Sequence, residues 1–121
     1  MATVIWVAIG GAVGSLARYG LSGMVNHRAY PWGTVAVNVA GCLLLGFLLG
    51  TWGFQADTPA RVGLTVGVLG GFTTFSTFAL DTLYLWERGE ASLAAVSLFA
   101  SVVAGLGAGI LGLVLGRSLS S

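Results

Sequence analysis

Four long apolar segments follow one another along the chain, and short polar joints separate them. The segments cover residues 3–24, 33–54, 60–86 and 91–115. Each has about the 20 mostly apolar residues that an α-helix needs to cross a bilayer. The joints contain prolines, charges and turn-forming residues. This pattern predicts an all-α membrane protein with four transmembrane helices, folded as a single domain over residues 1–121.

Two local signals mark where the predicted helices begin and end. Thr58 followed by Pro59 is typical of a helix start, with threonine as the N-cap and proline in the first turn. Tryptophans stand near the expected helix ends, as in the aromatic belts at membrane surfaces. They are Trp6, Trp32, Trp52 and Trp86.

A polar run interrupts the third segment. Residues 70–78 read Gly-Gly-Phe-Thr-Thr-Phe-Ser-Thr-Phe. Each glycine weakens a helix by about 1 kcal/mol relative to alanine, and an unpaired hydroxyl in hydrocarbon is costly. We therefore expect a third helix that is broken near Gly70, with irregular backbone that protein buries or that lines a polar cavity. Such a break favours a protein that binds or moves a small solute.

Composition supports the membrane assignment and limits the possible partners. Hydrophobic residues make up 56% of the chain and charged residues only 7%, against about 25% charged residues in soluble domains. The net charge of +1 is too small to suggest nucleic-acid binding. The single cysteine, Cys42, cannot form an intramolecular disulfide and is interpreted as a small buried hydrophobe. No cleavable signal peptide is evident, so we expect the first segment to be retained.

The arginines are almost evenly divided between the two sides of the membrane. With four spans, both termini share one side with the second joint, together with Arg61 and Arg117. The other side holds Arg28 and Arg88, and also Arg18 if it reaches the interface. The positive-inside rule therefore favours no orientation. Either the chain inserts both ways and pairs as an antiparallel dimer, or other features select one orientation. Frequent small-xxx-small spacing and the small size of a four-helix bundle favour oligomerisation.

Two polar residues lie inside the predicted spans. Arg18 is either a fixed positive charge, which attracts an anion or anchors a neighbouring helix end, or a side chain that extends to the interface. Asn38, near the start of the second helix, either makes an interhelical hydrogen bond or acts as a pore donor.

Aromatic and hydroxyl side chains alternate in the third segment. Phe75 and Phe78 are three residues apart and share a helix face, and the edge of an aromatic ring is positive. Together with the hydroxyls of Ser76 and Thr77, the ring edges form a track that is suited to a desolvated anion. The alternative for the two phenylalanines is ordinary packing in lipid or in the core.

Three further polar residues extend this pattern. Ser97 and Ser101, four residues apart on the fourth helix, either continue the track or bond to their own backbone. Asp81 lies one turn past Phe78, where its charge belongs either to a vestibule or to the interface.

The sequence contains no evident nucleophile–base pair, phosphate-binding loop or metal-ligand cluster, so we do not expect an enzyme. The main alternative is a small four-helix proton-coupled multidrug or cation antiporter, which needs an acidic residue deep in the membrane. The acidic residues all lie near predicted helix ends. They are Asp57, Asp81, Glu87 and Glu90. A non-transporting assembly subunit would explain the glycines but not the polar run.

Three motifs in order resemble those of the CrcB/Fluc family of fluoride channels, and the resemblance covers nearly the whole chain. The third motif is specific, whereas the glycine motifs alone are weak. The motifs are Gly10–Gly11–x–x–Gly14–x–x–x–Arg18–Tyr19, then Gly33–Thr34–x–x–x–Asn38–x–x–Gly41, then the run at residues 70–78.

This resemblance implies an architecture and a function. It implies an antiparallel, dual-topology homodimer with two fluoride pores in a bacterial-type inner membrane. It also implies a structural sodium ion at the dimer centre, held by the backbone carbonyls of Gly70 and Thr73. The nearly balanced arginines agree with dual topology independently. The implied function is passive export of fluoride, which lowers the toxicity of this anion inside the cell.

The resemblance also assigns roles to side chains. Asn38 corresponds to a pore asparagine, and Phe75 and Phe78 to rings whose edges face the ion. Ser97 stands where many members have tyrosine, and Asp81 stands where glutamate is frequent. The remaining assignments are a hydroxyl track of Ser76, Thr77 and Ser101, with Arg18 and Asp81 as charges beside the pathway.

Overall fold

The structure is a computed structural model that describes residues 1–25, 32–53 and 58–120. Helices make up nearly all of this part of the chain, and no strand occurs in it. Four helical stretches are long and apolar enough to cross a membrane, which confirms the all-α class and the four predicted spans. The fourth stretch continues past the expected end at residue 115. The stretches are Ala2–Val25, Trp32–Trp52, Pro59–Glu87 and Ala91–Ser120.

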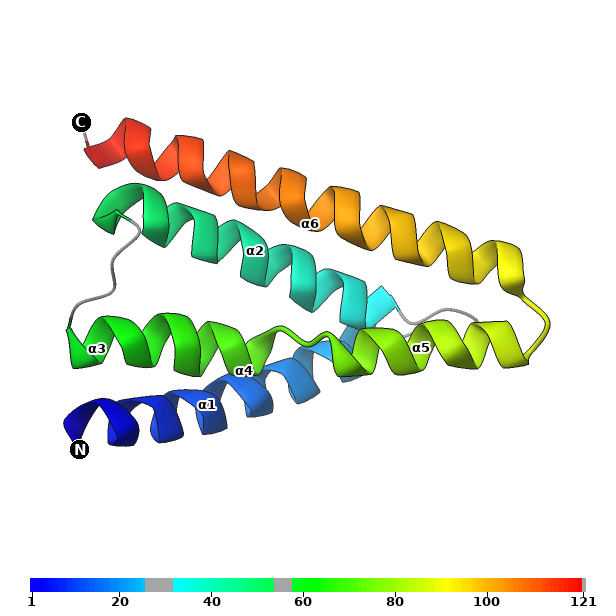
Figure 1. The fold of residues 1–121 in the computed structure, drawn as a ribbon, viewed down its shortest axis with the longest axis horizontal. Helices are drawn as coiled ribbons and strands as arrows, with labels where there is room; N and C mark the ends of the chain where they lie inside the picture. The colour runs from blue at the N-terminus through cyan, green and yellow to red at the C-terminus, as the bar shows by residue number, and fades with distance from the viewer. Residues whose placement is uncertain (26–31, 54–57, 121) are drawn as a thin grey trace.

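The third span differs from the others because it contains several elements (Figure 1). The other spans are α1 (Ala2–Val25), α2 (Trp32–Trp52) and α6 (Ala91–Ser120). The third consists of α3 (Pro59–Val62), the π-helix η1 (Gly63–Leu69), α4 (Gly70–Phe72) and α5 (Ser76–Glu87). Its start is as predicted, because the Thr58 hydroxyl accepts a hydrogen bond from the Arg61 N–H at 3.2 Å.

The non-helical backbone of the third span lies after the glycine pair. Thr73 has extended dihedral angles, φ −89° and ψ 156°, and α5 begins only at Ser76. Gly70 and Gly71 are themselves helical, so the expected position near Gly70 is a few residues too early. Packing explains the difference, since a Cβ at Gly71 would lie 2.7 Å from the Gly11 carbonyl oxygen. This glycine allows α1 to approach and does not end the helix.

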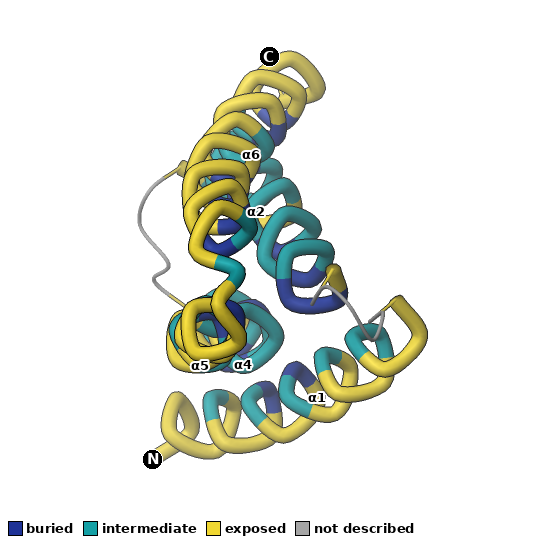
Figure 2. The backbone as a smooth tube through the Cα atoms, turned by 90° about the vertical axis from the view of Figure 1, so that its right-hand side faces the viewer, coloured by how far each residue is buried: buried dark blue, intermediate teal, exposed yellow. Residues whose placement is uncertain are grey.

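Glycines bring the helices together in two close pairs. In the first pair, Gly10 and Gly14 of α1 lie against the third span, and a Cβ on Gly14 would clash with the Val68 carbonyl oxygen. In the second pair, Gly46 of α2 and Gly112 of α6 each meet the backbone of the other helix. Small residues allow membrane helices to pack through close van der Waals contact. Figure 2 shows buried positions where the helices of each pair face one another and exposed positions on their outer sides.

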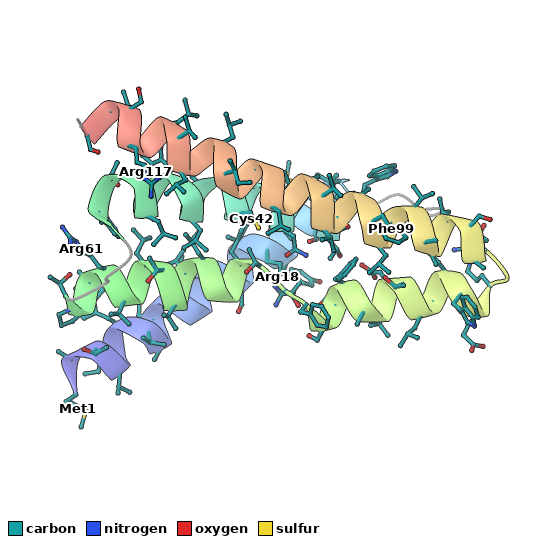
Figure 3. The ribbon with its side chains drawn as sticks, turned by 45° about the horizontal axis from the view of Figure 1, so that its top comes forward. Met1, Arg18, Cys42, Arg61, Phe99 and Arg117 are labelled. Carbon is teal, nitrogen blue, oxygen red and sulfur yellow. The ribbon has the colours of Figure 1, made fainter. Side chains whose placement is uncertain are left out.

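Both chain termini lie beside the end of α2 and the start of α3, as expected for four spans (Figure 1). Arg61 and Arg117 lie at this end of the molecule (Figure 3). The Arg61 guanidinium stacks on the Trp52 ring, 4.9 Å from its centroid. Arg88 follows α5 and therefore belongs to the opposite end, whereas Arg28 lies outside the described residues.

A single copy of the chain buries few of its apolar side chains. The large side chains on the outer faces of α1 and α6 are mostly exposed. Contiguous apolar surface of this kind is rare on soluble monomers, but it suits a helix bundle that is surrounded by lipid. The buried hydrophobic residues in the described ranges are Val37, Leu69, Phe78, Leu85 and Ala94.

Candidate functional site

A hollow of about 520 Å³ lies where α2, α6 and the backbone after α4 come together. Its lining includes six residues that the sequence analysis singled out: Asn38, Gly70, Thr73, Phe75, Phe78 and Ser101. Cys42, Thr74, Val102, Gly105 and Leu106 complete it. The other candidates, Arg18, Ser76, Thr77 and Asp81, are not part of this lining.

Asn38 links α2 to the non-helical backbone of the third span. Its Nδ2 donates to the Thr74 carbonyl oxygen at 3.0 Å, and its Oδ1 accepts from the Thr74 N–H at 2.8 Å. The side-chain amide therefore bonds to both backbone groups of one residue. Gly41 permits this approach, because a Cβ there would clash with the Thr73 side chain. Asn38 therefore makes the interhelical hydrogen bond that was one of its two expected roles. The other role, as a pore donor, stays a prediction.

The same contacts redirect two backbone donors. In a continuous α-helix, the N–H groups of Thr74 and Thr77 would bond to the carbonyls of Gly70 and Thr73. Here the Thr74 N–H bonds to Asn38 Oδ1 at 2.8 Å, and the Thr77 N–H bonds to Thr74 Oγ1 at 3.2 Å. The carbonyls of Gly70 and Thr73 are thereby released from their helical donors. Carbonyls of unwound membrane helices are suitable ligands for sodium.

Arg18 is held by the neighbouring helix end. Its Nε donates to the Gly71 carbonyl oxygen at 3.1 Å, which in a continuous helix would bond to the N–H of residue 75. Figure 3 shows Arg18 near the middle of the long axis of the molecule. A cation there also complements the negative end of the helical dipole. The contact agrees with the anchoring interpretation of Arg18.

Replacing Arg18 with leucine is expected to destabilise the protein by about 1.5–3 kcal/mol, the range for hydrogen bonds to charged groups. The Gly71 carbonyl would lose its donor at membrane depth. Unfolding of the purified protein by SDS titration measures the change in free energy. Arg117→Leu is the matched control, because Arg117 is exposed in the last turn of α6, and its effect is expected to stay within about 0.5 kcal/mol. Equal effects of the two substitutions would contradict the anchoring role.

Phe75 and Phe78 meet edge to face at the start of α5. Their ring centroids lie 6.0 Å apart, with an angle of 70° between the ring planes. Phe78 is buried, whereas Phe75 is 80% exposed. The hydroxyls around these rings are also close to one another, with Ser76 Oγ 3.4 Å from Thr74 Oγ1. A single copy of the chain therefore leaves one of the two rings uncovered.

The remaining polar candidates lie on α5 and α6. Ser101 is only 9% exposed, and its Oγ has no hydrogen-bond partner among the described residues. Ser97, one turn earlier, is buried as well. Asp81 is half-buried and accepts a hydrogen bond from the Thr34 hydroxyl, while its Oδ2 has no partner in the part of the chain that is described. Ser101 thus belongs to the lining of the hollow and has a hydroxyl without a described partner, whereas Asp81 lies apart from the hollow.

Sequence reasoning missed the place of Cys42. Cys42 was expected to be a small buried hydrophobe, but it is half-buried and lines the hollow. Helical spacing contained the signal, because Asn38 and Cys42 are four residues apart and share a face of α2. Ser101 and Gly105 are related in the same way on α6. These two faces both belong to the lining of the hollow.

Known proteins show close similarity to nearly the whole chain. The model of a family described as CrcB-like protein, Camphor Resistance (CrcB), matches residues 5–113. A protein of Paracoccus denitrificans named fluoride-specific ion channel FluC is 47% identical over 119 residues, which cover 97% of this chain and 96% of the relative. Proteins with the same name from Nitrobacter winogradskyi and Agrobacterium fabrum are each 46% identical. These alignments cover 94% and 98% of this chain, and 94% and 99% of the respective relatives.

Proposed function

Since this chain belongs to the CrcB family, we propose that it is a fluoride-selective channel through which fluoride leaves the cell passively. The observation that carries the proposal is the hollow at the non-helical backbone of the third span, which polar residues and two phenylalanines line within apolar helices. The relatives named fluoride-specific ion channels support the choice of anion. The protein is a multi-pass integral membrane protein, and a bacterial inner membrane fits this function.

Fluoride is small and strongly hydrated, so a selective path has to replace its water with other donors. The Asn38 amide has two N–H donors, of which one bonds to the Thr74 carbonyl, and the second is the proposed pore donor. The Ser101 hydroxyl offers another donor. The positive ring edges of Phe75 and Phe78 complete the proposed coordination.

The remaining candidate residues flank this path in the proposal. The hydroxyls of Ser76 and Thr77 continue the track along α5. Arg18 raises the positive potential near the pathway while it anchors the helix end, and Asp81 belongs to a vestibule. A passive channel carries out no chemical reaction, so the proposal includes no enzymatic activity.

The proposal includes an antiparallel, dual-topology homodimer. Phe75 is 80% exposed although it belongs to the proposed ion path, so a single copy leaves this path incomplete. A second copy in the opposite orientation would cover the ring and create a second, equivalent path. The nearly even division of the arginines between the two sides is consistent with insertion in both orientations.

In the proposal, the third transmembrane helix is a broken helix that also holds a structural sodium ion. The carbonyls of Gly70 and Thr73 fit such an ion, since their helical donors bond elsewhere and oxygen atoms are the ligands of hard cations. Two carbonyls from each of two copies would surround a site at the dimer centre. When bound, sodium would supply a positive charge that attracts the carbonyl oxygens at the broken third helix of each copy.

Fluoride efflux from liposomes tests the proposed function. The purified protein is reconstituted with internal fluoride, a potassium ionophore is added, and a fluoride electrode follows the release. We expect rapid passive loss of fluoride, with little loss of chloride in parallel vesicles. Matched release of both anions would contradict selectivity, and no release from verified dimers would contradict the channel. Proton-coupled cation transport would then be the next function to test.

A further inference from the structure

The Cys42 sulfur lies beside Gly105 in the lining of the hollow. It stands one helical turn after Asn38 on α2, and a Cβ built on Gly105 of α6 would lie 3.6 Å from its Sγ. Because residue 105 is glycine, no side chain fills the space opposite the sulfur. Cys42 also lines a second, more apolar hollow of about 270 Å³, which shares Gly105 and Leu106 with the first. The thiol therefore lies where the two hollows adjoin.

A second residue in the lining of this hollow carries a hydroxyl without a partner among the described residues. Ser101 stands one turn before Gly105 on α6, lines the same hollow as Cys42 and is 9% exposed. Its Oγ has no hydrogen-bond partner within the described ranges. A buried hydroxyl without a partner is unfavourable, so a ligand that supplies a contact to this oxygen would be stabilised.

We propose that Cys42, assisted by Ser101, binds one thiophilic metal cation that has a single open coordination position, and that this ion blocks fluoride. The block rests on the proposed channel function, whereas the binding does not. Thiolates are the preferred ligands of soft metal ions. One cysteine suffices for an organomercury cation such as methylmercury, and the Ser101 oxygen adds a weaker contact.

The binding step is a ligand exchange without oxidation or reduction. Methylmercury chloride is neutral and enters the hydrocarbon layer. The S–H bond of Cys42 and the Hg–Cl bond break, and an S–Hg bond forms. The proton passes to water and chloride is released. The bound group then occupies space beside Asn38, on the side of the hollow where Ser101 lies.

Intact-mass measurement and fluoride efflux on the same reconstituted protein test this proposal. Cys42 is the only cysteine, so the unmodified chain is already a single-thiol protein. We expect one methylmercury adduct per chain and a fall in efflux of at least about tenfold. This fall corresponds to an activation free energy for permeation that is about 1.4 kcal/mol higher. Excess cysteine is expected to remove the adduct and restore efflux. No adduct, or an adduct with unchanged efflux, would overturn the proposal.

Two variants control for the position of the thiol, each compared with its own efflux before the reagent. Cys42→Ser is expected to form no adduct and to show no block. Leu44→Cys in the Cys42→Ser background moves the thiol to an exposed position of the same helix, since Leu44 is 50% exposed. It is expected to form an adduct without a block. A block by this second thiol would show that the hollow is not the site.

A third variant tests the contribution of Ser101. Ser101→Ala is expected to release the adduct to excess cysteine about tenfold faster, which corresponds to the loss of one ordinary polar contact. Equal release rates would remove Ser101 from the site. Adduct formation is measured by mass and needs no flux. A chain that binds methylmercury but never conducts fluoride would therefore contradict the channel function and leave the binding site established.

Discussion

Replacing Asn38 with alanine is expected to lower fluoride efflux about 30- to 150-fold, since the variant loses two hydrogen bonds of about 1–1.5 kcal/mol each and every tenfold in rate corresponds to about 1.4 kcal/mol. The lost bonds join α2 to the Thr74 backbone. Without Asn38 Oδ1, the Thr74 N–H is free to return to the Gly70 carbonyl, as in a continuous helix. The carbonyl that we assign to sodium would then be occupied, and the proposed pore donor would be lost with it.

The measurement is fluoride release from liposomes that hold equal amounts of verified dimer. Thr51→Ala is the matched control on the same helix, because within the described ranges the Thr51 hydroxyl bonds only inside α2, to the carbonyls of Phe47 and Leu48 at 3.2 and 2.9 Å. We expect this control to keep its efflux. Efflux of Asn38→Ala within about threefold of the unmodified chain, a difference below about 1 kcal/mol, would show that Asn38 only packs the helices.

Gly14→Ala is expected to prevent stable folding, with a loss of about 3 kcal/mol or more, at the upper end of what overpacking causes. The added methyl group would clash with the Val68 carbonyl oxygen and lie 2.9 Å from the Phe72 N atom. These atoms belong to the backbone of η1 and α4, which cannot move aside as the end of a flexible side chain can. The pair formed by α1 and the third span would have to separate, which also removes the contact of Arg18 with Gly71.

Gly20→Ala is the control, because a Cβ at Gly20 of α1 would meet no atom of the described residues within 4 Å. Alanine is about 1 kcal/mol more favourable than glycine within a helix, so this variant should be as stable as the unmodified chain or more so. Size-exclusion chromatography in detergent gives the yield of folded protein, and SDS titration gives the free energy of unfolding. The two substitutions are thus expected to act in opposite directions. Similar yields and stabilities would refute the close packing at Gly14.

The polar run of the third span shows which structural features can be predicted from local sequence and which cannot. Its composition predicts that a regular helix cannot continue through residues 70–78, and the extended backbone at Thr73 falls within that range. The position of the interruption could not be predicted, because glycine has two uses in a membrane helix. It weakens the helix, and it lets another helix come close. Gly71 serves the second use against Gly11, and only the packing of α1 reveals this.

At the candidate site, Asn38 and Cys42 also show that the sequence predicts a kind of environment but not the contacting residues. An amide inside a span predicts a hydrogen-bonded partner, but many polar groups in the chain satisfy that requirement. The pairing with both backbone groups of Thr74 depends on how α2 lies against the third span. For Cys42, local hydrophobicity predicts burial. Its exposure to the hollow follows from a glycine 63 residues away in the sequence, Gly105, which leaves the opposite space open.

The sequence by itself determined the number of spans, their approximate bounds, the helix start at Thr58 and the segment in which polar chemistry is concentrated. These features depend on hydrophobic length, capping and local composition, which involve neighbours along the chain. Only the tertiary structure decided that Arg18 bonds to Gly71, that Asn38 redirects the Thr74 N–H, and that Cys42 and Ser101 line one hollow. These features depend on which helix surfaces meet, because hydrogen bonds and van der Waals contacts act only over short distances.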